Sequence, residues 1–328
     1  MLAFIQVNQT MWAKLQRFWS KHKSQRTIAA LHWKQECFNI ISLKESTSAI
    51  SVSQSQRQDF VMDQWPQALQ SLLNVVPDIQ EMVLVLAPEH YQLVQLDKPS
   101  VPDSELLQAL RWQLKELVSI PVDDMQIDYL DLPTPHQQQQ ARLQVVVSSK
   151  QLLQQMVALL QKKRIKIDTI LPEEWALQSL APEQNYPTLC LSHQPDQDVS
   201  LMIIRAGQVC FSRRIRGLQQ LHKYSLEELQ QGVLDNLGLE VQRSVDYFEG
   251  QLKQAPVRHL MLALDSEVQN RIAEFFRQLG FAQVEELNLS SWLPNLSYKE
   301  QAEFALPLAA AVSKLSDKVQ EKKLENAS

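Results

Sequence analysis

Glycine is scarce in this chain, with only 6 glycines in 328 residues, where roughly 7% is typical. Glycine lets a backbone take positive φ angles and approach a phosphate group closely. A chain with so few glycines has few positions at which a phosphate-binding loop can form. The shortage therefore argues against the Gly-rich nucleotide sites of many α/β proteins.

Cysteine is also rare, and its spacing excludes two further kinds of site. The three cysteines, Cys37, Cys190 and Cys210, contain no C-x-x-C pair. They suit a reducing compartment and indicate neither a disulfide framework nor a zinc site. No histidine pair has metal-ligand spacing, so we expect no metal. Ser-His-Asp, Cys-His, paired-carboxylate and Walker-type patterns are missing too, and we expect no enzyme and assign no catalytic residue.

Long apolar runs and an excess of positive charge are both lacking. No stretch approaches 18 uninterrupted apolar residues, so the sequence predicts no transmembrane helix. The net charge of −5 disfavours a nucleic-acid partner, because binding phosphates requires a basic surface. The N-terminus lacks the basic region and small-residue cleavage site of a signal peptide. We therefore expect a cytoplasmic protein.

Residues 11–26 form an unusual basic segment. Four apolar side chains fall on one helical stripe, and basic residues without any acid surround them. This pattern predicts either an interfacial helix that lies on anionic lipid or on a partner, or a leader whose aromatic residues dock on their own domain. The candidate anchor residues are Trp12, Lys14, Leu15, Arg17, Phe18 and Trp19.

The rest of the chain divides into two halves with the same order of predicted elements. Each half begins with short β-rich runs and continues with helix–strand–helix units, which is typical of a duplicated α/β domain. We predict a first half over 27–185, with a small inserted subdomain at about 98–164, and a second half over 186–316. The flanking segments 1–26 and 317–328 are predicted to be a basic amphipathic segment and a disordered tail.

A helix is expected over 103–118, and Trp112 on it is predicted to be a core or interdomain anchor. Its predicted core stripe consists of Leu106, Leu107, Leu110, Leu114 and Leu117.

The longest helical signal runs over 225–254, with a break predicted near Gly238. In its later part, Glu240, Arg243 and Asp246 are spaced by three residues. This spacing predicts an exposed salt-bridge ladder on one helix face.

The second half carries a motif of a known family. LEVQRSVDYFEGQL precedes the strand VRHLMLAL and fits an E-hydrophobic-x-R-S-hydrophobic-[DE]-aromatic pattern. The matching residues are Glu240, Arg243, Ser244, Asp246 and Tyr247. The chain thereby resembles the PilM family, actin-like cytoplasmic proteins of type IV pilus machines, and the segment FSRRIRG also fits that family.

The first-half segment ALRWQLKELVSIPVDDMQIDYLDLP resembles one branch of this family more closely, the MshI branch of the mannose-sensitive haemagglutinin (MSHA) pilus. The matching residues are Arg111, Trp112, Lys115, Ile120, Pro121, Asp124 and Asp128. The order and spacing of the motifs carry the resemblance, which spans most of residues 27–315.

The resemblance implies an actin-like fold, that is, a duplicated ribonuclease H-like α/β fold with a small PilM/FtsA-type subdomain inserted. It also implies a cytoplasmic adaptor, peripherally associated with the inner membrane, in the inner-membrane platform of a pilus. The expected partner is the cytoplasmic N-terminus of a PilN-like membrane protein, bound between the first subdomain and the inserted one. Pilus motor ATPases, an anionic membrane surface and a second copy of the chain are further expected partners.

Actin-like proteins hold ATP with Gly-containing hairpin turns, typically D-x-G-[ST]. Here the first hairpin has the sequence AALHWKQECF and the second LCLSHQPDQDVSL, and the later strand segment LMLALDSEVQ has no Gly pair. We therefore expect a degenerate nucleotide site, a pseudo-ATPase, without a cofactor. The alternative is an ATP-binding protein that uses magnesium and regulates partner binding by nucleotide. An unrelated α/β scaffold is the third hypothesis.

Overall fold

The computed structural model describes residues 27–45, 50–76, 78–133, 141–178, 184–266 and 268–325. The chain divides into two compact units. Unit 1 contains the described residues up to Ala176 and those from Leu306 onward, whereas unit 2 contains Leu177–Ala305.

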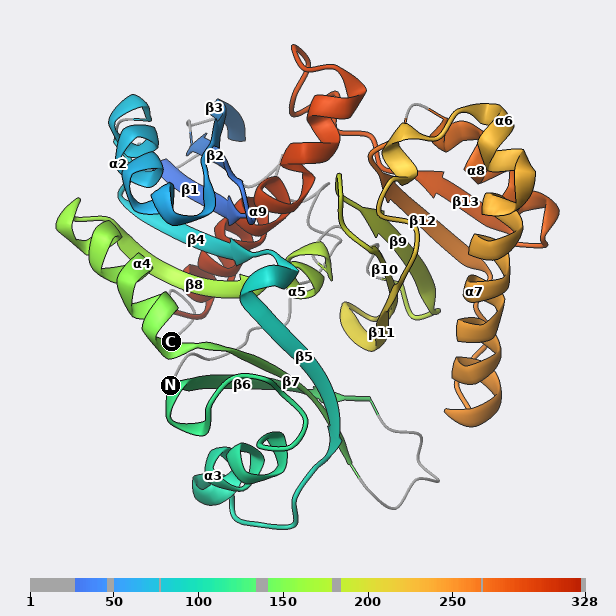
Figure 1. Cartoon of the computed structure of the whole chain (residues 1–328), viewed down its shortest axis with the longest axis horizontal. Coiled ribbons are helices and arrows are strands. Elements are labelled where there is room, and N and C mark those ends of the chain that lie inside the picture. The colour runs from blue at the N-terminus through green and yellow to red at the C-terminus, as the bar shows by residue number, and fades with distance from the viewer. Residues whose placement is uncertain are drawn as a thin grey trace. The chain divides into compact units, whose positions relative to one another are not determined.

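Unit 1 is built on a five-stranded sheet in the order β3-β2-β1-β4-β8 (Figure 1). β1, β2 and β3 form an antiparallel meander, whereas β1, β4 and β8 run parallel. The central strands β1 and β4 are buried along nearly their whole length, as expected for strands covered on both faces. The strands are β1 (Thr27–Trp33), β2 (Cys37–Glu45), β3 (Ile50–Asp59), β4 (Glu81–Leu86) and β8 (Lys166–Pro172).

Helices α2 (Trp65–Val75) and α4 (Lys150–Lys162) pack on this sheet because each buries one apolar stripe. Their leucines join side chains of β1 and β4 in one core cluster. α9 (Tyr298–Glu325) contributes its later part to unit 1. There Lys314 forms an ion pair with Asp168 of β8, with 2.6 Å between Nζ and Oδ2.

Unit 2 repeats the same topology. Its sheet has the order β11-β10-β9-β12-β13, again with an antiparallel meander followed by parallel strands. The strands are β9 (Thr188–His193), β10 (Val199–Arg205), β11 (Gln208–Ile215), β12 (His259–Leu264) and β13 (Gln283–Glu286). The identical strand order confirms the duplication expected from the sequence.

Unit 2 contains the helices α6 (Leu226–Glu228), α7 (Leu234–Asp246) and α8 (Gln269–Gln278), and the first part of α9 up to Ala305. π-helical turns precede and follow α7, at Leu229–Val233 and Tyr247–Gln251. The break in this helical region lies at Gly232, whose φ is +104°, and not near Gly238 as predicted. Gly238 lies inside α7, where a Cβ would stand 2.9 Å from the Phe275 ring of α8, so the close packing of the two helices favours glycine at this position.

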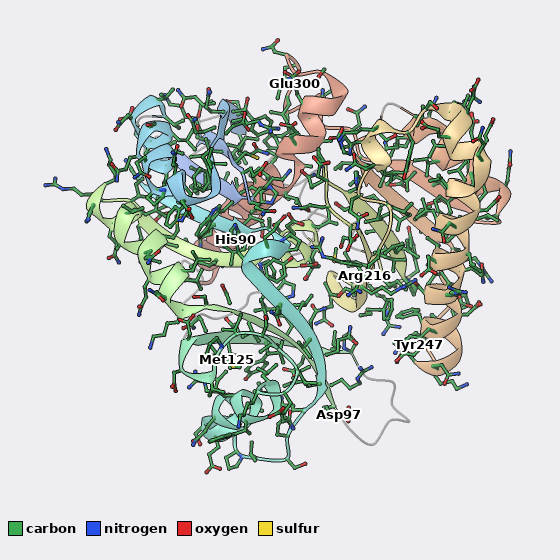
Figure 2. All side chains as sticks on the ribbon, in the orientation of Figure 1. His90, Asp97, Met125, Arg216, Tyr247 and Glu300 are labelled. Carbon is green, nitrogen blue, oxygen red and sulfur yellow. The ribbon has the colours of Figure 1, made fainter. Side chains whose placement is uncertain are left out.

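A three-stranded antiparallel sheet, in the order β5-β7-β6, is inserted in unit 1. It consists of β5 (Tyr91–Asp97), β6 (Met125–Leu132) and β7 (Arg142–Ser149), and α3 (Asp103–Leu114) packs against it. In Figure 1 the long strand β5 leads from the end of β4 down to this sheet. Figure 2 labels His90 at the upper end of β5 and Asp97 at its lower end.

The limits of these parts differ from the prediction in three ways. The inserted sheet begins at β5, before residue 98, and α4 packs with the large sheet. The later part of α9 belongs with unit 1 because its alanine-rich apolar run is buried there. α9 continues to Glu325, so residues 317–325, expected to be disordered, are helical; Gln, Glu, Lys and Leu in this stretch favour a helix.

α3 also ends earlier than predicted, at Leu114. Leu106, Leu110 and Leu114 are buried at intervals of four residues, which is one helix face. Leu107 and Leu117 are about half exposed and lie off that face, contrary to the prediction.

Candidate functional site

A groove with a volume of about 430 Å³ lies in unit 1 between α4 and the inserted sheet, next to the ends of β4 and β8. A groove of this size and largely apolar lining is typical of ligand sites. The lining residues are Leu86, Gln126, Ile127, Asp128, Val146, Ser148, Lys150, Leu153, Gln154, Val157, Ala158, Gln161, Ile170, Leu171 and Pro172.

Helix and strand periodicity explains why these side chains meet. On α4, residues at positions 150, 154, 157 and 161 recur every three or four residues and so share one face. On the inserted sheet, Asp128 is opposite Val146 across the β6–β7 pair. Among the described strands, β6 is also an edge strand, since only β7 pairs with it there. An extended peptide can add to such an edge.

Asp128 is the acidic residue of the groove. Its Oδ1 accepts a hydrogen bond from the backbone N–H of Tyr129 at 2.9 Å. Burial raises the pKa of Asp128 above the usual aspartate value, since low polarity disfavours the charged form. Among the described residues no basic side chain forms a salt bridge with it.

Lys150 is the basic residue of the groove, and its positive charge interacts with the carboxylate of Asp124, which does not line the groove. Asp124 accepts hydrogen bonds from the Ser149 hydroxyl at 2.6 Å and from the Gln151 N–H at 2.8 Å. These bonds, together with the charge of Lys150, lower the pKa of Asp124. Asp124 therefore remains ionised beside Lys150, at the N-terminus of α4 where an anion is favoured.

The N-terminal turn of α5 (Glu173–Gln178) connects the two sheets of unit 1. His32 Nε2 of β1 lies 2.8 Å from Glu173 Oε1. The Tyr91 hydroxyl of β5 donates a hydrogen bond to Glu174. Trp175 Nε1 donates to Gln144 Oε1 of β7 at 2.9 Å. Three consecutive residues thus hold strands of both sheets beside the groove.

Aromatic side chains of unit 1 pack beside the turn between β1 and β2, in which Gln35 and Glu36 are exposed. Trp33 packs between His90 and Trp65, with ring centroids 4.3 Å and 4.7 Å away. Burial lowers the pKa of His90 to about 4, against an opposing hydrogen bond with the backbone of Lys34. His90 is therefore neutral at physiological pH, and the turn has no phosphate-binding cation from this side chain.

Side chains of unit 2 hydrogen-bond with the aspartates of the turn between β9 and β10. Gln219 donates a hydrogen bond to Asp198, and Gln220 donates to Asp196 at 2.8 Å. Lys223 also lies 3.4 Å from Asp196. Although burial opposes it, these contacts lower the pKa of Asp196. Both aspartates of this turn are thus bound by side chains of their own unit.

The other residues singled out in the sequence lie at separate places. The candidate anchors Trp12, Lys14, Leu15, Arg17, Phe18 and Trp19 are outside the described residues. Trp112 is 64% exposed, so the prediction of a core anchor is wrong; its position on α3 faces away from the leucine stripe. Arg243 pairs with Glu240 at 2.6 Å, but Asp246 accepts instead from Gln242. The predicted ladder therefore stops after one pair.

Within the described ranges, no group of three or more His, Cys, Asp or Glu residues is placed to hold a metal ion. No helix there is long and apolar enough to span a bilayer.

The duplicated five-stranded sheets define an actin-like fold, and solved structures agree. The chain is similar to a structure described as a "PilM-PilN type IV pilus biogenesis complex" at 14% identity and a TM-score of 0.64, covering 89% of this chain and 98% of that one. It is also similar to the cytoplasmic domain of EpsL, an inner-membrane component of the type II secretion system of Vibrio cholerae. There the identity is 13% and the TM-score 0.50, with coverage of 85% and 94%.

A Bacteroides thetaiotaomicron protein with an actin-like ATPase fold and unknown function matches at 8% identity and a TM-score of 0.50, with coverage of 86% and 96%. No protein-family model matches the chain. No curated protein matches it either. These likenesses show the fold, and they leave the role of the groove to be inferred from its chemistry.

Proposed function

We propose that this protein is a cytoplasmic adaptor in the inner-membrane platform of a type IV pilus or a related secretion machine. It binds a short, extended cytoplasmic segment of a PilN-like membrane protein in the groove between α4 and the inserted sheet. The groove is the observation that carries this proposal, because it combines apolar pockets with β6, an edge strand among the strands that the structure describes. The matching residues of α3 and β6 favour the MSHA type of pilus.

Sheet-edge binding explains how a preformed groove can hold a peptide without nucleotide. Backbone hydrogen bonds to an edge strand supply affinity, and pockets for alternate side chains supply specificity. The apolar residues Leu153 and Val157 of α4 and Ile170 of β8 offer such pockets.

A labelled synthetic peptide of the PilN-like partner's cytoplasmic tail tests the proposal by fluorescence anisotropy. Ala158→Trp places a bulky ring in the groove and should abolish binding at tens of micromolar. Gln155→Trp is the matched control, since Gln155 is an exposed residue of the same helix that does not line the groove. Equal binding by wild type and Ala158→Trp, or no binding by wild type, contradicts the proposal.

We further propose that partner binding needs no nucleotide and that the protein is a pseudo-ATPase. The support is that the turns at 34–36 and 194–198 contain no glycine, and that side chains of their own units pack beside the first turn and hydrogen-bond with the aspartates of the second. Thermal unfolding with and without Mg-ATP tests this, because a ligand of the native state must raise the melting temperature. A rise of several degrees would instead favour the alternative, an ATP-binding protein with nucleotide-regulated partner binding.

The basic segment 11–26 is proposed to hold the adaptor at the membrane or on a membrane partner. Its support is the sequence pattern alone, an aromatic stripe with unopposed basic residues. Flotation with anionic liposomes should carry wild type upward and leave the triple variant Trp12→Ala, Phe18→Ala, Trp19→Ala behind. Equal flotation of both would exclude a lipid-bound role.

A further inference from the structure

Asp128 stands out in the groove because a carboxylate is placed among apolar side chains there. Its neighbours in the lining include Val146, directly opposite on β7, and Val157 and Leu153 of α4. Taking a carboxylate out of water costs free energy unless hydrogen bonds or an opposite charge compensate it. A backbone N–H supplies one hydrogen bond, and no described cation forms a salt bridge with this residue.

The second charge of the groove does not compensate Asp128. Lys150 lies at the start of α4, where its charge acts on Asp124. Asp124 is fixed there by Ser149 and Gln151. A bound segment would therefore meet a negative charge at Asp128. At Lys150 it would meet a positive charge that Asp124 already compensates.

We infer that Asp128 is the specificity-determining residue of the groove and accepts a cationic group, a Lys or Arg side chain, from the segment bound there. This inference rests on the proposed function, since it assumes a peptide in the groove. The bound cation would stabilise a partly buried carboxylate whose charged form is disfavoured by burial. An apolar peptide without a cation, or one with an acid at that position, would bind less well.

The position of Asp128 on β6 makes this contact geometrically reasonable. Residues 126, 128 and 130 alternate to the face of the inserted sheet that is opposite the α3 face, where Met125 and Ile127 join the α3 cluster. A strand added along β6 places every second side chain on this same face. One residue of the added strand would therefore lie beside Asp128.

The test uses the full chain and the labelled tail peptide, with each Lys or Arg of the peptide replaced singly by Gln. A charge-assisted hydrogen bond is worth enough for about a 10- to 100-fold change in affinity. Asp128→Asn should weaken the unmodified peptide by about that factor, and one Gln peptide should bind wild type and Asp128→Asn equally. Asp131→Asn is the matched control, because Asp131 lies on the same strand but pairs with Lys98 outside the groove.

A charge exchange and a stability measurement complete the experiment. Asp128→Lys should recover binding when the identified peptide cation is replaced by Glu. Asp128→Asn should also raise the melting temperature of the free protein, whereas a merely structural aspartate would lower it. If the unmodified peptide binds, but each Gln substitution weakens binding to wild type and to Asp128→Asn by the same factor, the inference fails and the proposed function stands. If the tail peptide binds to no variant, both are overturned.

Discussion

Replacing His32 tests whether the contact between His32 at the end of β1 and Glu173 of α5 stabilises the fold, or whether this position is available to a ligand. His32 is fully buried, and its Nε2 lies 2.8 Å from the carboxylate of Glu173, which is 5% exposed. His32→Leu removes one partner of this pair while keeping an apolar side chain of similar size. Leaving a buried hydrogen-bonding group without its partner costs about 1–3 kcal/mol, and more where the group is charged. We expect a loss of about 3 kcal/mol in the free energy of unfolding.

Urea denaturation followed by tryptophan fluorescence measures this loss. Trp33, Trp65, Trp112 and Trp175 lie in the same unit as His32, whereas Trp292 lies in the other, so most of the signal from the described tryptophans reports on that unit. In thermal unfolding, a loss of this size should lower the melting temperature of unit 1 by roughly 6–12 °C. His32→Gln keeps a hydrogen-bond donor and should lose less. His259→Leu is a control, since that half-buried ring stacks on Tyr186, with 3.9 Å between the ring centroids.

A double-mutant cycle with Glu173→Gln separates the pair from its surroundings. If His32 and Glu173 stabilise each other, the double variant should be more stable than the sum of the single losses predicts. A loss below about 1 kcal/mol for His32→Leu, or strict additivity in the cycle, would refute a stabilising role for the contact between His32 and Glu173. These side chains at the end of β1 would then be available to a ligand, which would count against the pseudo-ATPase proposal.

Three further measurements check other parts of the structure. Lys314→Met should cost about 2–4 kcal/mol in urea denaturation, because its ion pair with Asp168 is 16% and 11% exposed and joins α9 to β8; no change would show that α9 is held by packing alone. Burial raises the pKa of Asp128, so the native state keeps that proton to a higher pH than the unfolded chain, and stability is lost as pH rises through this window. The gain in melting temperature of Asp128→Asn should therefore be largest at neutral pH and vanish in acid, and a gain independent of pH would contradict the shift. Burial raises the pKa of Cys190 to about 12 and of Cys210 to about 11, so neither thiol should react with iodoacetamide at about pH 8 until the protein is unfolded, as mass spectrometry of the two peptides would show.

The duplication of the fold could be predicted because it depends on local patterns repeated along the chain. Short apolar strands followed by amphipathic helices occur in each half, and the same strand order forms in each unit. The limits of the parts depend on long-range pairing instead. The local sequence pattern of β5 is compatible with pairing to a strand of the large sheet or to β7, and the structure pairs it with β7.

The groove could not be assembled from the sequence, because its residues come from five strands and helices separated along the chain. The existence of a site between the first subdomain and the inserted sheet was expected from the resemblance, but its residues were not. Asp128 was noted only as a family position, and Glu173 and Glu174 were not noted at all. Two adjacent acids at a strand–helix junction are a weak signal, since such residues are usually solvated at a helix N-terminus.

Trp112 shows the opposite error. Its spacing between Leu110 and Leu114 suggested burial, yet only positions four apart share the buried face of α3. Apolar character alone overestimates burial on a short helix that packs through a single stripe.

The short helix α5 has a consequence for how unit 1 opens in solution. Its first three residues contact β1, β5 and β7, so strands from both sheets depend on one helical turn. Segments that share such contacts unfold together as one cooperative unit. Backbone amides of β7 and those at the end of β1 should therefore exchange with deuterium at similar opening free energies, although they belong to different sheets. Local unfolding that opens the β1–β2 hairpin would then also disrupt β7, which lines the groove.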